Sequence, residues 1–192
     1  MIAMKNQLRI IGGEWKRRQL PFASIEGLRP TPDRVRETLF NWLMWDIQNA
    51  RVLDLCAGSG ALSFEALSRG ASHVLMVEPN QIQAQCLKDN AQLLQAKNCQ
   101  IKIATAQQTL ASLNDQFDVV FLDPPYSLDL WQTLANVADP VIKADGFIYV
   151  EADQDLNRLQ LPHTWKKIKE TKAGSVRAGL YQKISVASSA SE

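Results

Sequence analysis

The sequence predicts an α/β protein whose core is a mostly parallel β-sheet with helices on both faces. From residue 51 onward, short and almost continuously apolar runs alternate with segments whose apolar residues recur at helical spacing. Strands of that composition are typical of a sheet that is buried on both faces, and the helices supply the crossovers that parallel strands need. Near the carboxyl end, two strand-like segments flank a short turn and predict an antiparallel hairpin.

Length and composition favour one globular domain. The 192 residues can bury a sizeable core, and fractions of 46% hydrophobic and 21% charged residues are ordinary for a folded protein. The first residues hold no apolar run as long as that of a signal peptide, and no other stretch approaches the length of a membrane span. We therefore expect a cytoplasmic protein without membrane contact, and we expect it to be a monomer.

The net charge of +1 conceals an uneven distribution. Residues 1–36 carry eight Lys or Arg against three acids, and residues 163–183 carry six against one. The intervening residues 37–162 hold seven Lys or Arg against fifteen acids. A polyanion such as nucleic acid would be attracted to both ends, although solvated surface residues explain the same pattern.

The N-terminal segment 1–30 is expected to form an arm that lies against the domain or a partner. It contains a short apolar strand that runs into a glycine pair, Arg9–Gly13, and then the basic run Lys16–Arg18. A helix is predicted to begin at Thr31, because a threonine can cap free amide groups and Pro32 suits the first helical position. The residues that form its apolar face are Val35, Leu39, Trp42 and Leu43.

The elements after residue 50 are predicted in alternating order. Strands are expected at 51–56, 73–78, 100–104, 117–123 and 147–151, with helices at 60–69, 81–96, 107–113 and 128–137. The hairpin strands are expected at 165–171 and 176–184. One domain would then span residues 31–184, and the small polar tail 185–192 is expected to be disordered.

The loop after the first strand of this sheet predicts a site for an adenosine-containing cofactor. Ligands of open parallel sheets bind beyond the carboxyl ends of the strands, and glycines in such a loop let a ligand approach the backbone. Glu78 ends the next strand, 18 residues beyond Gly60, where a carboxylate can accept hydrogen bonds from ribose hydroxyls. Asp54 can receive either a ligand ammonium or the amide groups of the loop. The expected cofactor contacts are Asp54, Ala57, Gly58, Ser59, Gly60 and Glu78.

The segment Asp123–Tyr126, directly after a buried strand, predicts the chemistry. Two prolines stiffen the backbone, so that the Asp123 carboxylate and the Pro124 carbonyl become fixed acceptors, and Tyr126 offers a stacking surface. Two rigid acceptors can hold both hydrogens of an amine on a planar ring and aim the nitrogen lone pair at an electrophile. We therefore take Asp123, Pro124, Pro125 and Tyr126 as the candidate catalytic residues. The alternative is a purely structural role, in which the segment is a rigid turn with a capping aspartate.

No metal site is predicted. The three cysteines, Cys56, Cys86 and Cys99, are widely spaced, lie in apolar segments and form no cluster with either histidine.

At this level of detail the sequence resembles the bacterial RsmD-type 16S rRNA (guanine-N2)-methyltransferases, a family usually named for guanine 966 of the small-subunit rRNA. The resemblance covers nearly the whole chain except the tail. It rests on the segments Arg9–Gly13, Leu28–Thr31, Asp33–Leu43, Asp54–Leu62, Glu65–Ala71, Asp123–Tyr126 and Tyr149–Glu151.

The resemblance implies a class I (Rossmann-like) methyltransferase fold with a seven-stranded, mostly parallel sheet that ends in an antiparallel hairpin, and S-adenosyl-L-methionine as cofactor. It implies that Asp123, Pro124 and Tyr126 hold the target guanine, and that 16S rRNA or the small ribosomal subunit is the partner. The expected RNA contacts are Arg9, Gly12, Gly13, Arg18, Arg29, Thr31, Arg34 and Arg36.

The chain departs from the family pattern at two places. Ser63 stands where a glycine is expected, and Thr105-Ala106 stands where related enzymes often carry Asp or Asn before Ala. Thr105 and Ala106 are the positions expected to contact the adenine of the cofactor, and the first of these contacts is in question.

Three other interpretations remain. The same pair of rigid acceptors would also suit methylation of adenine N6, cytosine N4 or a protein glutamine. An NAD-dependent oxidoreductase would call for a complete glycine fingerprint and a hydride-transfer residue, and neither is evident. An RNA-binding module with a vestigial cofactor site would bind RNA without transferring a methyl group.

Overall fold

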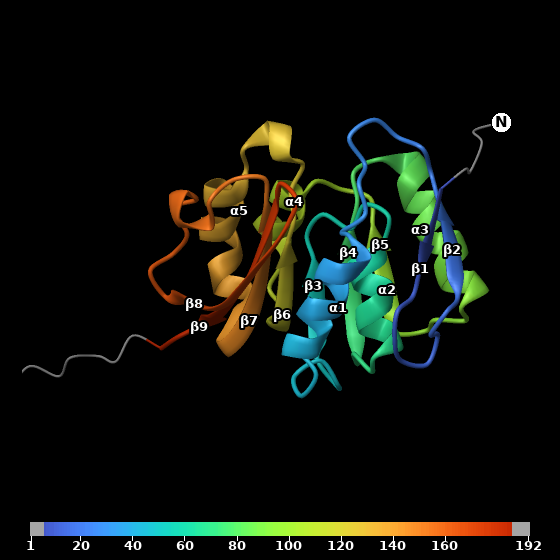
Figure 1. The fold of residues 1–192 in the computed structure, drawn as a ribbon, viewed down its shortest axis with the longest axis horizontal. Coiled ribbons are helices and arrows are strands. Elements are labelled where there is room, and N and C mark those ends of the chain that lie inside the picture. Colours follow the sequence, from blue (N-terminus) through green and yellow to red (C-terminus); the bar gives the residue numbers. More distant parts are fainter. Residues whose placement is uncertain (1–5, 186–192) are drawn as a thin grey trace, which may run out of the picture.

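A computed structural model describes residues 6–185 and contains a seven-stranded sheet with helices on both faces (Figure 1). The strand order is β5-β4-β3-β6-β7-β9-β8; the strands from β5 to β7 are parallel, and β9 and β8 are antiparallel to their neighbours. The α/β fold class predicted from the sequence is confirmed. The strands of this sheet are β3 (Arg51–Asp54), β4 (His73–Val77), β5 (Cys99–Lys102), β6 (Phe117–Leu122), β7 (Ile142–Ala152), β8 (Trp165–Ala173) and β9 (Val176–Lys183).

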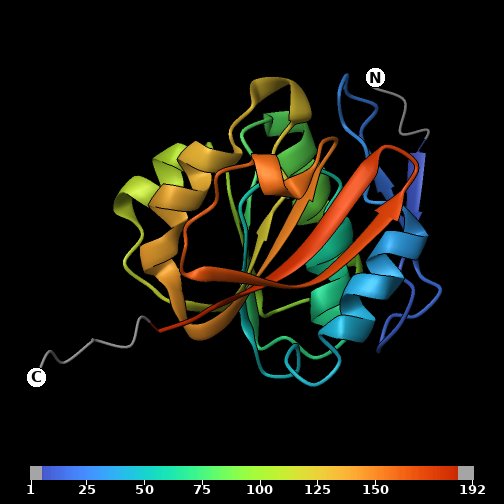
Figure 2. The same ribbon diagram turned by 60° about the vertical axis from the view of Figure 1, so that its left-hand side comes forward.

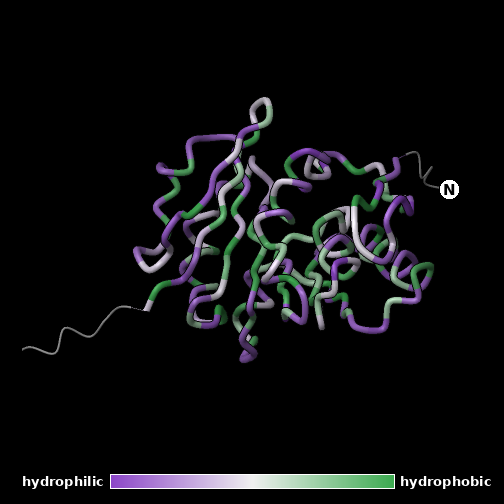
Figure 3. Tube along the Cα trace, turned by 60° about the horizontal axis from the view of Figure 1, so that its bottom comes forward, coloured by the Kyte–Doolittle hydropathy of each residue, from purple (hydrophilic) through white to green (hydrophobic). Residues whose placement is uncertain are grey.

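The helices divide between the two faces of the sheet, as Figure 2 shows. Side chains alternate along each strand, so that Val52 and Leu53 of β3 belong to different apolar clusters. Figure 3 shows hydrophobic segments running through the interior of the chain trace and hydrophilic segments in many of the loops. On one face pack α1 (Asp33–Trp42), α2 (Ala61–Ser68) and α3 (Gln81–Leu93), and on the other α4 (Ala106–Ser112) and α5 (Trp131–Ala138).

The N-terminal segment is more regular than the sequence indicated. It forms a two-stranded antiparallel sheet of β1 (Asn6–Arg9) and β2 (Gln19–Phe22), and it buries Ile10 and Leu20 in the same apolar cluster as α1, α2 and α3. Glu65 of α2 is fully buried and accepts hydrogen bonds from the amides of Ile11 (3.0 Å) and Gly12 (2.8 Å). The segment is thus part of the core.

Helix α1 begins one residue later than predicted. Pro32 occupies the N-cap position without a side-chain capping bond, and Thr31 is buried beside it, so the expected Thr31 cap is wrong. The predicted apolar face is otherwise present, since Val35, Leu39 and Leu43 are buried.

Two other elements begin three or more residues away from the predicted start. Strand β7 begins at Ile142, five residues early, because its pairing with β6 contains a register shift between Phe117 and Val119. Helix α5 begins late because a 3₁₀ turn precedes it and Asp129 takes a left-handed conformation. The 3₁₀ helices are Tyr126–Leu128, Asp139–Val141 and Leu156–Arg158.

None of the helices within residues 6–185 has the length and apolar character that crossing a membrane requires. The predicted disorder of the tail concerns residues that, apart from Ser185, lie outside the described part of the chain.

Candidate functional site

A cavity of about 800 Å³ opens beyond the carboxyl ends of β3, β4, β6 and β7. Its walls include the glycine loop after β3, the Asp123–Tyr126 segment after β6 and residues 25–31 of the N-terminal segment. The volume lies in the range of small-molecule sites in proteins. The two motifs singled out in the sequence therefore meet in one cavity.

Asp54 is the buried acid at the base of this cavity. It is 1% exposed, and its Oδ2 accepts a hydrogen bond from the Ser63 hydroxyl at 2.6 Å. Its Oδ1 has no hydrogen-bond partner among the described residues. Burial raises the pKa of Asp54 to about 6, against the opposing effect of the Ser63 hydrogen bond. A buried oxygen of this kind is an acceptor suited to a ligand donor.

The glycine loop is shaped by two left-handed residues. Gly60 has a φ of 82°, and a Cβ there would lie 2.6 Å from the Phe64 ring. Gly58 has a φ of 53°, and a Cβ there would approach Leu28 to 2.9 Å. Only glycine fits both positions without strain, which holds the loop backbone against the cavity. Ala57 and Ser59 line the cavity from the same loop.

Glu78 lies opposite this loop at the end of β4. Its Oε2 accepts a hydrogen bond from the Gly58 amide at 3.3 Å, and burial raises the pKa of its carboxyl. The remaining acceptor positions of the carboxylate stay available to hydroxyl donors in the cavity.

These features fit S-adenosylmethionine. The unpartnered Oδ1 of Asp54 suits the ammonium group of the methionine moiety, and Glu78 suits the ribose hydroxyls. Ala106 lines the cavity where the adenine would lie. Thr105 lines it too, but its Oγ1 accepts from the Gln108 amide (3.1 Å), and its own amide donates to Gln108 Oε1 (2.9 Å). Thr105 thus forms a capping box for α4.

The Ser63 departure has a structural explanation. The hydroxyl that a glycine would lack is the donor that satisfies one oxygen of Asp54. Ser63 is fully buried within α2, so this contact orients the Asp54 carboxylate from below the cavity.

Asp123 and its neighbours form the second wall of the cavity. Asp123 is half-buried directly after β6, Pro124 is buried, and Pro125 and Tyr126 continue the lining. Burial raises the pKa of Asp123 well above its usual value, and the nearby Glu151 and Asp54 carboxylates raise it further. No ion pair within residues 6–185 includes Asp123. Its acceptor oxygens therefore lie in the cavity wall without a neutralising cation.

Glu151 is a cavity residue to which the sequence assigned no role. It is 3% exposed at the end of β7, and it accepts hydrogen bonds from the hydroxyls of Tyr126 (2.9 Å) and Tyr149 (2.8 Å). The Tyr126 ring also stacks on Trp131, with ring centroids 6.0 Å apart. The only signal in the sequence was the Tyr149–Glu151 segment of the family resemblance. The tyrosine is thus held both at its hydroxyl and at its ring.

The eight residues expected to contact RNA fall into two groups. Arg9, Arg18, Arg29 and Arg34 are exposed, and Arg29 also lines the cavity. Arg34 donates to the Lys172 carbonyl at 3.0 Å, which ties α1 to the β8–β9 hairpin.

The other four residues are engaged in contacts within the protein or line the cavity. Arg36 is 1% exposed and pairs with Asp33 and with buried Glu65 (3.8 Å), so its guanidinium faces the core. Gly12 donates its amide to Glu65, and a Cβ on Gly13 would lie 2.0 Å from the Ser68 carbonyl oxygen. These three residues thus make contacts that support the fold around α1 and α2, whereas Thr31 is buried and lines the cavity.

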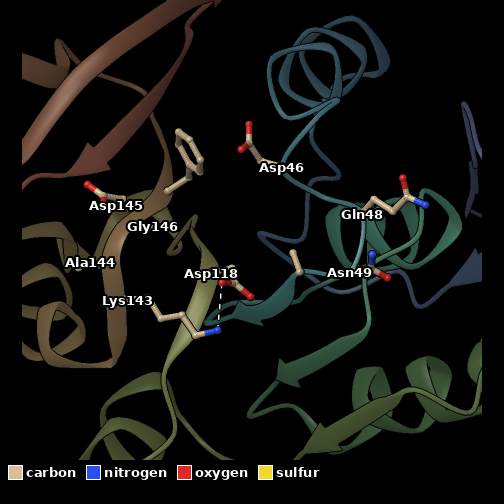
Figure 4. A pocket seen from close by; sticks show the side chains of 10 residues that line it. Asp46, Gln48, Asn49, Asp118, Lys143, Ala144, Asp145 and Gly146 are labelled. Atoms are coloured by element: carbon tan, nitrogen blue, oxygen red, sulfur yellow. Dashed lines mark hydrogen bonds and ion pairs between the residues drawn. The ribbon is translucent and has the colours of Figure 1, made fainter.

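A smaller hollow of about 240 Å³ lies at the opposite, amino-terminal edge of the sheet (Figure 4). It is lined by acids and amides, among them Asp118 at the start of β6. Asp118 is satisfied within the protein, because it pairs with Lys143 at 3.0 Å and accepts from the Arg51 amide at 2.8 Å. We therefore do not treat this hollow as a candidate site.

Neither metal nor thiol chemistry is supported by the side chains of residues 6–185. No group of three or more potential metal ligands occurs among them. Burial and the neighbouring acids raise the pKa of the Cys56 thiol well above its usual value, which leaves a neutral thiol beside the cavity.

Comparison with known proteins gives a consistent result. A family model described as "Conserved hypothetical protein 95" matches residues 8–182. A protein of Haemophilus influenzae named ribosomal RNA small subunit methyltransferase D is 43% identical over 185 residues, which cover 93% of this chain and 95% of the relative. The protein of the same name from Escherichia coli K12 is 40% identical and covers 92% of this chain and 90% of its own length.

Solved structures agree with the fold. The structure of a putative methyltransferase, yhhF, from Escherichia coli has a TM-score of 0.85 and 39% identity, covering 94% of this chain and 100% of its own. SMU.776, a putative methyltransferase complexed with SAH, has a TM-score of 0.69 at 12% identity and covers 85% of this chain and 53% of its own. At that identity the likeness shows the fold alone.

Proposed function

Because this chain belongs to the family of the ribosomal RNA small subunit methyltransferase D proteins, we propose that it methylates the exocyclic N2 amine of a guanine in 16S rRNA. It is an rRNA methyltransferase with S-adenosylmethionine as methyl donor, and guanine 966 is the proposed target. One observation carries the finer proposal: the acceptor segment Asp123–Tyr126 and the unpartnered Asp54 line the same cavity.

Residues on one side of the cavity would bind the cofactor and orient it. Asp54 would accept hydrogen bonds from the cofactor ammonium through Oδ1, and Glu78 from the ribose hydroxyls. The glycine loop would pack against the ligand through Ala57, Gly58 and Ser59, which line the cavity, whereas Gly60, where a Cβ would meet Phe64 and Leu87, is not among the lining residues. When bound, S-adenosylmethionine supplies an electrophilic methyl group on a sulfonium, so no metal or covalent nucleophile is called for.

The substrate side presents the amine. We propose that the Asp123 carboxyl and the Pro124 carbonyl each accept one amine hydrogen, while Tyr126 stacks on the base. The bond to Asp123 contributes about 1.5–3 kcal/mol when this carboxyl is ionised, the bond to the neutral Pro124 carbonyl about 0.5–1.5 kcal/mol, and stacking about 1–3 kcal/mol. Asp123 is also placed to take the proton that the methylated nitrogen loses, and its raised pKa suits a base for that step.

The RNA side of the proposal uses the exposed arginines. Arg29 lines the cavity, Arg9 lies on β1, Arg18 directly precedes β2, and Arg34 lies on α1. Guanidinium groups there would pair with phosphates around the target base. With rRNA or the small ribosomal subunit as partner, we also propose a cytoplasmic monomer.

Transfer of tritiated methyl groups into separated rRNA, DNA and protein fractions tests the substrate class. We expect label in 16S rRNA from a strain that lacks this gene, and nucleoside mass spectrometry to identify N2-methylguanosine at position 966. Label in adenine N6, cytosine N4 or protein glutamine would overturn the guanine assignment, and absence of transfer with retained RNA binding would favour a binding module.

A further inference from the structure

Asp123 and Glu151 lie side by side at the carboxyl edge of the sheet. Leu122 of β6 pairs with Val150 of β7 in parallel register, so the next residue of each strand is one of these two acids. Both line the cavity, and Glu151, through its charge and a side-chain hydrogen bond, helps to raise the pKa of Asp123. The acceptor that holds the substrate amine therefore has a second acceptor beside it.

Glu151 retains an acceptor position for a ligand. The Tyr126 hydroxyl donates to Oε2 and the Tyr149 hydroxyl to Oε1, so both oxygens act as acceptors. A carboxylate offers about four lone-pair positions; the two tyrosine bonds and the side-chain hydrogen bond between Glu151 and Asp123 leave about one of them for a ligand. The tyrosines also fix the orientation of the carboxylate, while Trp131 donates to the Glu151 backbone carbonyl at 2.9 Å.

The wall around this pair offers acceptors, and Arg29, the cation among the described residues that line the cavity, forms no ion pair with either acid. No ion pair within residues 6–185 includes Asp123 or Glu151. The other ionisable groups that interact with them are Asp54, Cys56, Tyr126 and Tyr149, and both tyrosine protons are already directed at Glu151. Such a wall suits a ligand edge that carries adjacent hydrogen-bond donors.

Among the candidate substrates, guanine has that edge. Its N1–H and N2–H₂ groups are neighbouring donors. Adenine N6 and cytosine N4 are each next to a ring nitrogen that is an acceptor, and its lone pair would face a carboxylate. A base held outside a helix is read by hydrogen bonds to this edge.

We infer that Glu151 is a specificity-determining residue, whose carboxylate accepts the guanine N1–H while Asp123 accepts an N2–H. This inference rests on the proposed function, because it assumes that the base amine lies at Asp123. A guanine so placed supplies two donors to a pair of acids that has no cation. Adenine, cytosine and a glutamine amide lack the second donor.

The test replaces the target guanine of a 16S rRNA fragment with 2-aminopurine, which keeps the amine but has an acceptor at N1. For the wild-type protein we expect kcat/KM to be at least about fivefold higher with guanine, since one matched base contact contributes about 1–3 kcal/mol of discrimination. In Glu151→Gln the side-chain amide can donate to N1 of the analogue, and we expect the preference to fall to within about threefold. The analogue also lacks O6, but that loss affects both enzymes alike.

Tyr149→Phe is the matched control. It removes a donor to Glu151 and leaves the carboxylate in place, so turnover should fall while the preference for guanine persists. An unchanged preference in Glu151→Gln, or equal use of both bases by the wild-type protein, would overturn the inference. A preference lost equally in Glu151→Gln and Tyr149→Phe would also overturn it, because the effect would then be structural.

Two further measurements separate this result from other failures. Calorimetric binding of S-adenosylhomocysteine shows whether Glu151→Gln retains its fold and cofactor site; if it does not, Glu151→Asp, which keeps an acceptor, takes its place and should keep the preference. If the wild-type protein methylates neither fragment but labels another substrate, the proposed function fails. Transfer to both bases without discrimination refutes only the role of Glu151.

Discussion

The two edges of the sheet carry similar residues but differ in how these residues are paired. At the amino-terminal edge, Asp118 forms an ion pair with Lys143 and accepts the Arg51 amide. At the carboxyl edge, Asp123, at the other end of β6, has no cationic partner among the described residues, and Asp54 leaves one oxygen without a hydrogen bond. Asp118, at the amino-terminal edge, has its partners within the protein. Asp54 and Asp123, at the carboxyl edge, keep acceptor positions that a ligand can fill.

This difference identifies the functional edge better than the number of acids does. Buried acids without partners destabilise a protein, and they persist where a ligand supplies the missing charge or donor. The raised pKa values of Asp54, Glu78 and Asp123 all have burial as their largest cause. Under the proposed function, the carboxyl edge would receive the cofactor ammonium and the amine hydrogens of the base.

The largest expected effect comes from Asp123→Ala. Removal of an acceptor aimed at the reacting nitrogen should lower kcat about 10²–10³-fold, by analogy with the loss of a preorganised transition-state contact. Binding of S-adenosylhomocysteine should remain, because Asp54 and the glycine loop are untouched. Methyl transfer to 16S rRNA and calorimetry measure the two quantities.

Asp118→Ala is the control on the same strand. It should cost about 1 kcal/mol of the free energy of unfolding, since one ion pair and one backbone acceptor are lost, without a comparable effect on turnover. Equal losses of turnover in the two variants would remove the functional distinction between the edges.

The next largest effect is expected on cofactor affinity, which should depend on pH through the ionisation of Asp54. A ligand ammonium is held best by the ionised carboxylate, whose fraction increases as pH rises through the Asp54 pKa of about 6. The affinity for S-adenosylhomocysteine should therefore rise between about pH 5 and pH 7 and then level off. Asp54→Asn should bind about tenfold to a hundredfold more weakly at pH 7.5 and lose this pH dependence. A wild-type Kd that does not change with pH would contradict the assigned contact.

Much of the architecture was accessible from the sequence because apolar periodicity and glycine placement are local signals. The alternating runs from Val52 onward predicted the parallel sheet, and the two motifs were placed at its carboxyl edge by topology alone. The resemblance then supplied the family. Boundaries were less accurate, because features such as the left-handed Asp129 depend on tertiary packing.

Side-chain pairing was not accessible in the same way. Arg36 and Arg34 are two residues apart on one helix, yet Arg36 faces buried Glu65 and Arg34 is exposed. Charge counting treated them alike. Glu151 was missed as a site residue because its proximity to Asp123 depends on the register between β6 and β7. No local sequence pattern specifies that register.

A smaller effect is expected from the exposed arginines at the carboxyl edge. Arg29→Ala and Arg34→Ala should each weaken RNA binding and reduce the slope of log K against log salt by about one unit, because one phosphate contact is lost. Lys143→Ala, at the other edge, is the matched removal of a positive charge and should leave that slope unchanged. Equal slopes in all three variants and the wild-type protein would place the RNA elsewhere. Filter binding at several salt concentrations measures this.

The smallest expected effect comes from Ser63→Ala, which removes the hydroxyl donor to Asp54 Oδ2. That hydrogen bond lowers the pKa of Asp54, so its loss should raise the pKa above about 6 and move the pH dependence of cofactor binding upward. At pH 6.5 the Kd for S-adenosylhomocysteine should increase a few-fold, whereas at pH 8, where the carboxyl is ionised in both proteins, the difference should be smaller. Calorimetry at both pH values measures this. An equal loss at both would mean that Ser63 acts on the shape of the cavity and not through the charge of Asp54.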